Sequence, residues 1–431
     1  MTYTSLYRTH GYLPLDAPGQ AERIALIDLD AIEANVRQIK KLIGPRELIA
    51  VIKADAYGHG SLDVARSALA AGANYLGVVH VSEAHQLRQG GIQAPIIAWI
   101  HTPRTDFQQA LEDRLELGFS SQWELKKIAQ AHQALKRQDA VRLHLKVDTG
   151  LGRNGSTLED LPALAAAARH LEEAGIIKVV GLFSHLAVAD EPDRPETDQQ
   201  AQAFNQALAC IQEAGLNPSL RHLANTPATL TAARQQKPEK LLRDAVRLGL
   251  GLYGLSPLAK ASPADLGLTP AMHLQTFVSS VKEVPAGQGV SYGLNYSTQK
   301  PTTLALIPMG YADGVPRLAT GGPVRLYPAG RPAQTYPVVG RIAMDQMVID
   351  LGEPGLADPS AGYLGAPAVL FGAGQNPPVT DWAEAAGTIN YEVVTRISPR
   401  VSRISIGGSW QENQEDTRQG ESEEPTAEKG Q

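Results

Sequence analysis

The chain has 431 residues, of which 43% are hydrophobic and 19% charged, values ordinary for a folded enzyme of two domains. Its net charge of −6 is concentrated in residues 411–431, where seven acidic and two basic side chains leave about −1 for the rest. This balance gives no indication of binding to nucleic acid or a membrane. The single cysteine, Cys210, excludes an internal disulfide framework and fits a reducing compartment. Because the N-terminus also lacks a signal-peptide pattern and a spanning segment, we expect a cytoplasmic protein.

An N-terminal extension over residues 1–20 precedes the pattern of an α/β domain. Residues 24–29 predict a short strand, and Asp30 can cap the amphipathic helix that follows. Apolar runs of strand length then alternate with stretches of the length of a crossover helix. The eight runs are residues 48–53, 75–79, 95–100, 115–119, 141–147, 178–185, 219–224 and 246–250. Eight strand–helix units in about 200 residues favour a (β/α)8 TIM barrel over an open doubly wound sheet, so we predict a barrel over residues 21–255.

The residue composition and the pattern of apolar runs change after the predicted barrel. Residues 256–270 are rich in Pro, Ala, Gly and Ser and predict a linker. Short β-prone runs separated by turn residues follow, namely residues 276–283, 302–307, 336–339, 347–351 and 368–371. We therefore predict a mostly-β domain over residues 256–410. Residues 411–431 have too few apolar side chains to offset the entropy of ordering, which predicts a disordered acidic tail.

The stretch AVIKADAYGHG, residues 50–60, carries the strongest local sign of chemistry. Lys53 follows a buried strand, where partial desolvation lowers the pKa of an amine and makes it available for a Schiff base. A lone lysine at a strand end more often reaches solvent. Tyr57, Gly58 and Gly60 favour the functional interpretation, because a phenol and exposed backbone N–H groups suit a phosphate. A lysine beside a phosphate cradle predicts pyridoxal phosphate as the cofactor.

The ends of the other predicted strands are unusually rich in polar side chains, and a barrel places its chemistry at these ends. They supply residues 146–153, His185, Asn225 with Thr226, and Arg247 with Gly249. The segment GLGLYG, residues 249–254, matches the dinucleotide pattern GxGxxG only formally, because no amphipathic helix follows it. We therefore reject a nicotinamide site, although these glycines can offer N–H groups to a phosphate. No metal site is expected.

Taken together, these motifs resemble those of bacterial alanine racemases of the barrel-fold, pyridoxal-phosphate-dependent type. The matching stretches are AVIKADAYGHG, LKVDTGLGRNG, GLFSHLAVADE, HLANTPA, VRLGLGLYGL, GVSYG, MGYADG, VGRIAMDQMVID and TINYEVVTRISPRVSR. They extend from about residue 25 to residue 403 and cover both predicted domains. The resemblance implies interconversion of L-alanine and D-alanine through a cofactor aldimine by two bases, supplying D-alanine for peptidoglycan.

The resemblance also implies a role for individual residues of the cofactor site. Lys53 would carry the aldimine, Arg247 would face the pyridine nitrogen, and His185 would pack on the ring. The phosphate would be held by Tyr57, Thr226, the backbone of Gly249 and Leu250, and Tyr391, and Asn225 would also belong to the cofactor site.

Other implied roles concern the substrate and a homodimer whose active sites are completed across its interface. Tyr292, the second base, and Met344, near the substrate carboxylate, would come from the other subunit. Arg153 would lie beside Tyr292, oriented by Lys146, which is often carbamylated in the family. The residues that match the substrate corridor are Asp190, Arg317, Arg341 and Ile389.

The chemistry of racemisation explains these residue types. A proton must leave one face of the substrate and another must return to the opposite face, which two bases do more directly than one. Tyr292 needs a cationic neighbour such as Arg153 to act as a phenolate near neutral pH. Arg247 retains its own proton and so leaves the pyridine neutral, a weaker electron sink that favours reprotonation over transamination.

Three alternatives remain open from the sequence. A decarboxylase with the same barrel would have an acidic partner for the ring nitrogen in place of Arg247. A cofactor carrier would not need the second domain or Tyr292. A serine racemase or a broad-specificity racemase differs only in pocket volume, which typically changes discrimination by about 1–3 kcal/mol. Two departures from the family pattern are Asp55, where asparagine is common, and Ala343, where many members have cysteine.

Overall fold

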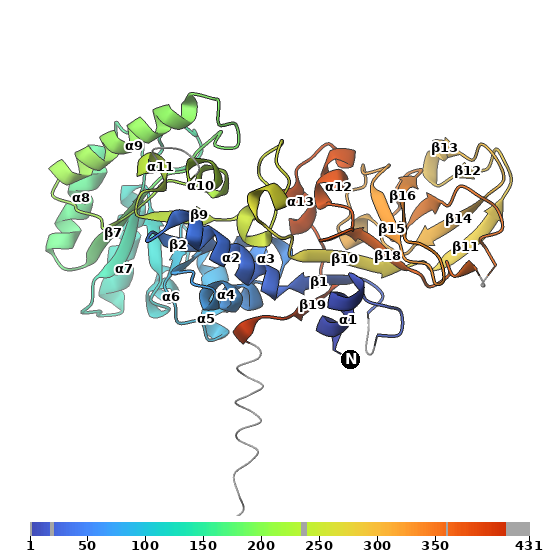
Figure 1. Cartoon of the computed structure of the whole chain (residues 1–431). Coiled ribbons are helices and arrows are strands. Elements are labelled where there is room, and N and C mark those ends of the chain that lie inside the picture. Colours follow the sequence, from blue (N-terminus) through green and yellow to red (C-terminus); the bar gives the residue numbers. More distant parts are fainter. Residues whose placement is uncertain (1, 18–20, 234–238, 359–360, 411–431) are drawn as a thin grey trace, which may run out of the picture. The chain divides into compact units, whose positions relative to one another are not determined.

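The eight alternating apolar runs form a closed parallel barrel, as predicted (Figure 1). The computed structural model describes residues 2–17, 21–233, 239–358 and 361–410, so the tail predicted for residues 411–431 lies outside the described residues. The chain forms two compact units. We call Ile32–Ala56 with Ser61–Thr269 the barrel unit, and Met1–Ala31 with Tyr57–Gly60 and Pro270–Gln431 the sheet unit.

Each strand of the barrel pairs in parallel with its neighbours, and β2 closes the ring against β9. The strands are β2 (Glu47–Val51), β3 (Tyr75–Val78), β4 (Ile96–Ala98), β5 (Glu116–Phe119), β6 (Val141–Lys146), β7 (Ile177–Phe183), β8 (Leu220–His222) and β9 (Ala245–Leu248). Part of the interior is an apolar cluster of Ile49, Ile97, Leu220 and Ala245 with Trp99 packed against it. This interior is filled by side chains, as in other barrels of this size.

Helices precede, connect and follow the strands of the barrel. They are α2 (Leu29–Ile43), α3 (Lys53–Gly58), α4 (Ser61–Ala70), α5 (Val81–Gln89), α6 (Phe107–Glu112), α7 (Gln122–Ala134), α8 (Leu161–Glu173), α9 (Glu196–Glu213), α10 (Thr226–Ala232) and α11 (Glu239–Leu242), with the 3₁₀ helices η1 (Leu250–Tyr253) and η2 (Ala264–Leu266). The amphipathic patterns within residues 125–135, 161–174 and 199–214 correspond to α7, α8 and α9. Each buries its apolar stripe, as the 3.6-residue period requires.

The sheet unit contains a nine-stranded sheet among its described residues. In spatial order its strands are β11 (Ser280–Val284), β14 (Thr302–Ile307), β17 (Met347–Asp350), β16 (Gln334–Val339), β15 (Pro323–Leu326), β18 (Pro367–Phe371), β10 (Met272–Phe277), β1 (Ile24–Asp28) and β19 (Ser402–Ile406). A hairpin of β12 (Gly289–Val290) and β13 (Tyr296–Ser297) accompanies it, with α1 (Tyr3–His10), η3 (Tyr292–Leu294), η4 (Tyr311–Asp313), α12 (Val379–Ala386) and α13 (Asn390–Thr395). The mostly-β character expected after the barrel is confirmed.

Two strands differ from their sequence-based expectation. The strand at residues 24–28 is β1, which pairs with β10 and β19 in the sheet unit, although the prediction grouped it with the barrel (Figure 1). The run at 276–283 is divided between β10 and β11, because β10 pairs with β1 and β18 whereas β11 pairs with β14. Both differences arise from pairing with residues far away in the sequence, which local periodicity does not encode.

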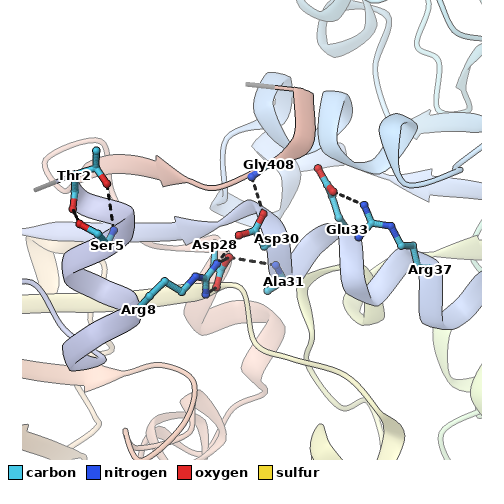
Figure 2. A network of polar contacts seen from close by, with 9 residues as sticks. All are labelled: Thr2, Ser5, Arg8, Asp28, Asp30, Ala31, Glu33, Arg37 and Gly408. Atoms are coloured by element: carbon cyan, nitrogen blue, oxygen red, sulfur yellow. Dashed lines mark hydrogen bonds and ion pairs between the residues drawn. The ribbon is translucent and has the colours of Figure 1, made fainter. Parts of the chain in front are cut away.

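Residues 2–17 of the N-terminal extension are part of the sheet unit. Leu6 and Tyr7 of α1 are buried in a cluster with Ile24, Leu26 and Ile406. Figure 2 shows the polar side of this attachment, where the Arg8 guanidinium contacts the carboxylates of Asp28 and Asp30. The start and the end of the described chain therefore share one hydrophobic core.

Candidate active site

The predicted site residues of the barrel unit lie at the carboxyl ends of its strands or in the loops that follow. Lys53 follows β2, Lys146 ends β6, and Arg153 is in the next loop; the others are His185 after β7, Asn225 and Thr226 after β8, Arg247 on β9, and Gly249 and Leu250 after β9. All carboxyl ends of a parallel barrel open at the same face, so we call this face the carboxyl mouth. Asp190, from the expected substrate corridor, is exposed in the loop after β7.

Four positively charged side chains converge at the carboxyl mouth. Burial holds the pKa of His185 well below its usual value, and the nearby charges of Arg247, Arg153, Lys146 and Lys53 lower it further. The imidazole is therefore neutral and presents a flat ring. A concentration of cations of this kind favours an anionic ligand.

Lys53 begins a turn of unusual handedness. Ala54, Asp55, Ala56 and Tyr57 have φ between +51° and +54°, so α3 is wound to the left. Such a conformation costs about 1–2 kcal/mol per residue for an L-amino acid, and it persists where surrounding contacts impose it. The Ala54 N–H donates to Glu83 Oε1 at 2.7 Å, and the Asp55 carboxylate accepts from the N–H of Ser61 at 2.7 Å. Aspartate tolerates this conformation much as asparagine does, which explains why it can replace the family's common residue.

The amines of the two lysines have lowered pKa values for related reasons. For Lys53 the causes are burial and the charge of Arg153, opposed by Glu83. For Lys146, burial together with Arg247 and Arg153 lowers the pKa to about 8. With a pKa of about 8, an appreciable fraction of the Lys146 amine is neutral and nucleophilic near neutral pH, and the lowered pKa of Lys53 shifts that amine in the same direction.

Both terminal nitrogens of Arg247 donate to acceptors within the barrel unit. Its Nη1 donates to the carbonyl of His222 at 2.6 Å and to Nδ1 of that ring at 3.1 Å. Its Nη2 donates to the carbonyls of Ser184 at 2.6 Å and Leu223 at 3.0 Å. Burial lowers the pKa of Arg247 to about 9, and the guanidinium remains charged near neutral pH.

The loops after β8 and β9 form a cradle of hydroxyl and backbone N–H groups. The buried Thr226 hydroxyl accepts from the N–H groups of Gly249 at 3.0 Å and Gly251 at 3.4 Å. A Cβ at Gly251 would lie 2.9 Å from the Thr226 methyl, so only glycine permits this approach. Asn225 caps α10 by accepting from the Ala228 N–H at 3.2 Å. A lysine amine, a neutral imidazole, an arginine and this cradle are together a donor set that fits pyridoxal phosphate.

The remaining predicted residues lie in the sheet unit. The rings of Tyr57 and Tyr391 have centroids 6.3 Å apart, and burial together with Tyr391 raises the pKa of Tyr57. Tyr292 is 70% exposed and begins η3, between β12 and β13. Ser291 donates from Oγ to the Arg341 carbonyl at 2.6 Å, so these two loops are joined.

Met344 lies on a second loop of the sheet unit. It is 52% exposed, and its carbonyl accepts from the N–H of Ala312 at 2.9 Å. Ile389 and Arg317 are also exposed. The sheet unit therefore presents Tyr292, Met344 and Ile389 to its surroundings.

The two units each match one half of a known family. The profile "Alanine racemase, N-terminal domain" matches residues 27–257, and "Alanine racemase, C-terminal domain" matches residues 271–405. The chain belongs to the alanine racemase family. An alanine racemase of Beutenbergia cavernae is 44% identical over 388 residues, covering 89% of this chain and 98% of the relative. One of Salinispora arenicola is 46% identical over 385 residues, covering 88% of this chain and 97% of the relative.

Solved alanine racemase structures have the same fold. The enzyme from D-cycloserine-producing Streptomyces lavendulae has a TM-score of 0.83 at 43% identity, covering 91% of this chain and 99% of that one. The Clostridium difficile 630 enzyme has a TM-score of 0.79 at 31% identity, covering 90% of this chain and 96% of that one. The barrel and the mostly-β domain are therefore those of the family.

The described residues lack two further kinds of feature. No group of three or more His, Cys, Asp or Glu side chains there could hold a metal ion. Within the described residues, no helix is long and apolar enough to cross a bilayer.

Sequence reasoning missed three polar residues inside the barrel: Glu116, His144 and His222. All three are buried, and they connect Arg247 to the opposite end of the barrel. A signal was available in β6, VRLHLK, where Arg142, His144 and Lys146 alternate with apolar residues. Residues two apart in a strand face the same side, so this pattern places a polar stripe in the barrel interior.

Proposed function

We propose that this chain interconverts L-alanine and D-alanine with pyridoxal phosphate as its cofactor. The observation that carries the proposal is the set of cationic groups around Lys53 and His185 in a chain of the alanine racemase family. The sequence and fold are consistent with a cytoplasmic enzyme that supplies D-alanine for peptidoglycan.

Individual residues have distinct roles in holding the cofactor. Lys53 would bind its aldehyde carbon and Arg247 would donate to its ring nitrogen, with His185 packed on the ring. The phosphate ligands would be Asn225, Thr226, the backbone of Gly249 and Leu250, Tyr57 and Tyr391. Pyridoxal phosphate, when bound, supplies the electron withdrawal that makes the α-proton of the amino acid acidic.

Two bases then move the proton at the α-carbon. Lys53 serves one face, and its lowered pKa favours the neutral amine that a base requires. Tyr292 of the partner subunit serves the other, beside the Arg153 cation that favours its phenolate form. Met344 of the partner subunit would contact the substrate carboxylate. The high exposure of both residues in a single chain is consistent with coverage by a second copy.

Lys146 is proposed to be carbamylated. Its amine has a pKa of about 8, so roughly a tenth of it is neutral at pH 7 and able to react with carbon dioxide. The carbamate would be an anion and could orient Arg153, whereas an ammonium would repel it.

The choice of arginine at residue 247 supports racemisation over decarboxylation. Because Arg247 retains its proton and already donates to four acceptors, it can only donate to the ring nitrogen and cannot protonate it. The alternative is a broad-specificity or serine racemase, since Ala343 beside Met344 could enlarge the pocket.

Chiral analysis of the purified protein with pyridoxal phosphate and L-alanine tests the proposal, with L-serine and L-lysine in parallel. We expect rapid approach to equal amounts of D- and L-alanine and slow turnover of the others. Equal rates with serine would favour the alternative. Bound cofactor without D-alanine would refute racemisation, and released carbon dioxide would then identify a decarboxylase.

A mixing experiment tests the shared active site. K53A and Y292F homodimers should each be inactive, but subunit exchange would place one intact Lys53–Tyr292 pair in each heterodimer. Activity should recover to about a quarter of wild type, since half of the dimers are mixed and each has one intact site. No recovery after verified exchange would place both bases in one subunit. Y12F serves as a control tyrosine variant and should remain active alone.

A further inference from the structure

A continuous chain of hydrogen-bonded side chains runs through the barrel interior from the carboxyl mouth. Arg247 Nη1 donates to His222 Nδ1 at 3.1 Å, and His222 Nε2 lies 3.1 Å from His144 Nδ1. His144 Nε2 lies 2.6 Å from Glu116 Oε2. The four residues come from β9, β8, β6 and β5, and all are buried. We call this set the polar column.

The direction of every hydrogen bond in the polar column is forced. Arginine can only donate, so His222 Nδ1 must accept, and the ring of His222 must carry its proton on Nε2. That proton is donated to His144 Nδ1, which leaves His144 with its own proton on Nε2. The Glu116 carboxylate accepts this last proton. Both histidines are therefore neutral and have the same tautomer, which Arg247 fixes from one end of the polar column and Glu116 from the other.

The fold makes specific room for the polar column. A Cβ at Gly181 of β7 would lie 1.9 Å from His144 Nδ1, and a register shift between Leu143 and His144 brings the glycine opposite that histidine. The ring of Phe183 is stacked on His222, with centroids 4.9 Å apart and an interplanar angle of 6°. A bulge, a glycine and a stacked ring thus restrict both imidazoles.

The other end of the polar column reaches a cavity of about 620 Å³. Glu116 and Arg142 line this cavity together with Tyr75, Arg88 and Asp113. Arg142 Nε donates to Glu116 Oε1 at 2.6 Å, and the Arg142 side chain is half exposed. One carboxylate oxygen of Glu116 therefore accepts from the solvent-facing arginine while the other accepts from His144.

We propose that Glu116 is a positioning residue for Arg247, because its carboxylate sets the tautomers of His144 and His222 and thereby the orientation of the guanidinium. The inference rests on the proposed function, in which Arg247 faces the cofactor ring nitrogen. Without this acceptor the buried Nε2–H of His144 loses its partner, and the cost of that unpaired donor favours the other tautomer, in which His144 Nδ1–H donates to His222 Nε2. His222 would then present a donor to Arg247, and the guanidinium would turn away.

Three variants test the inference. E116L removes the acceptor at similar volume. E116Q keeps an acceptor for His144, because the glutamine carbonyl can face the imidazole. Its NH2 group then faces Arg142, whose half-exposed side chain can turn to solvent. R221L is the control: Arg221 Nε donates to Asp244 Oδ2 at 2.5 Å, a strand ion pair outside the polar column.

The first readout is the protonation of the imidazole nitrogens in the apoprotein, measured by ¹⁵N NMR with histidine-selective labelling. Signals of His144 and His222 are assigned from H144Q and H222Q. We expect wild type, E116Q and R221L to share the Nε2–H tautomer for both rings, and E116L to lose it. Unchanged tautomers in E116L would overturn the inference. This readout needs no activity, so it is decisive even if the chain does not racemise alanine.

The second readout is the ratio of transamination to racemisation per cofactor-loaded molecule. In E116L we expect racemisation to fall about tenfold and the ratio to rise, with E116Q restoring both to within about threefold of wild type. A purely structural role would lower the melting temperature of E116L, as is expected for R221L, and leave the ratio unchanged. That result would also overturn the inference.

Discussion

Gly181 on β7 faces His144 on β6 so closely that a Cβ at residue 181 would lie 1.9 Å from the imidazole Nδ1. Atoms cannot approach to this distance, so any side chain there must displace His144 or bend a barrel strand. The backbone conformation of Gly181 is not the reason for glycine, because its φ is not positive. The requirement is one of space alone.

G181A should therefore destabilise the protein by about 3 kcal/mol, the upper range for overpacking in a core. Urea unfolding of the apoprotein measures the change. The H144A variant should also be destabilised, because it leaves His222 Nε2 and Glu116 Oε2 without the partner that His144 supplies. The double variant G181A/H144A should lose less stability than the sum of the single losses, since the added methyl group then has room. Strict additivity would contradict this account of Gly181.

The left-handed turn after Lys53 predicts an unusual response to glycine. Ala54 is exposed and has a φ of +52°, so A54G should stabilise the apoprotein by about 0.5–1 kcal/mol by relieving strain. The matched control is Ala166, which is exposed in the right-handed helix α8. A166G should destabilise by about 1 kcal/mol. If both substitutions destabilise equally in chemical unfolding, the turn at Lys53 is not left-handed.

The barrel was accessible from the sequence because its signal is local. Each of its eight strands is a short apolar run bounded by turn residues, and each helix has its own 3.6-residue period. The carboxyl-mouth residues followed from the same pattern, since strand ends of a parallel barrel share one face. The expected positions of Lys53, Lys146, His185 and Arg247 could thus be given before their distances were known.

Features that depend on distant pairing were not accessible in this way. Ile24 pairs with Gln275, about 250 positions away in the sequence. The apolar pattern around Ile24 is the same for a barrel strand as for a strand of an open sheet, so it does not predict this pairing. The polar column was missed for a second reason. A buried histidine in a strand, such as His144 or His222, is usually a core residue whose hydrogen bonds are satisfied. Only the spatial order of donors and acceptors in the fold shows that the hydrogen bonds all run from Arg247 towards Glu116.

The attachment of α1 can be tested at Arg8 (Figure 2). Its guanidinium donates to both oxygens of the buried Asp28 carboxylate, at 2.5 and 2.6 Å, and to Asp30 at 2.8 Å. R8A would leave the carboxylate of Asp28 with only the N–H of Ala31, so we expect a loss of about 1–3 kcal/mol in urea unfolding.

The control for R8A is an exposed ion pair of a barrel helix. Arg169 Nε donates to Glu173 Oε1 at 3.0 Å, one turn apart on α8. Such pairs contribute only about 0.3–0.5 kcal/mol, so R169A should have little effect. Equal effects of R8A and R169A would mean that α1 is not held through Arg8.

The pH dependence of stability should carry a contribution from His273 on β10. This residue is fully buried, its Nε2 lies 3.2 Å from Gln275 Oε1, and burial lowers its pKa to about 4. An unfolded histidine has a pKa of about 6.5, so between pH 6.5 and 4 the unfolded state binds more protons than the folded state. Stability from this residue is therefore complete above pH 7 and decreases as the pH falls, by about 2 kcal/mol at pH 5.

H273L removes this titration. The variant loses the hydrogen bond to Gln275 at every pH, but its stability should decrease less between pH 7 and 5 than that of wild type, by about 2 kcal/mol. Urea unfolding at the two pH values measures the difference. His170 on α8 is exposed, so H170L should keep the wild-type dependence. The interpretation fails if the unfolding free energy of H273L decreases between pH 7 and 5 as much as that of wild type, because protonation of His273 would then not destabilise the folded state.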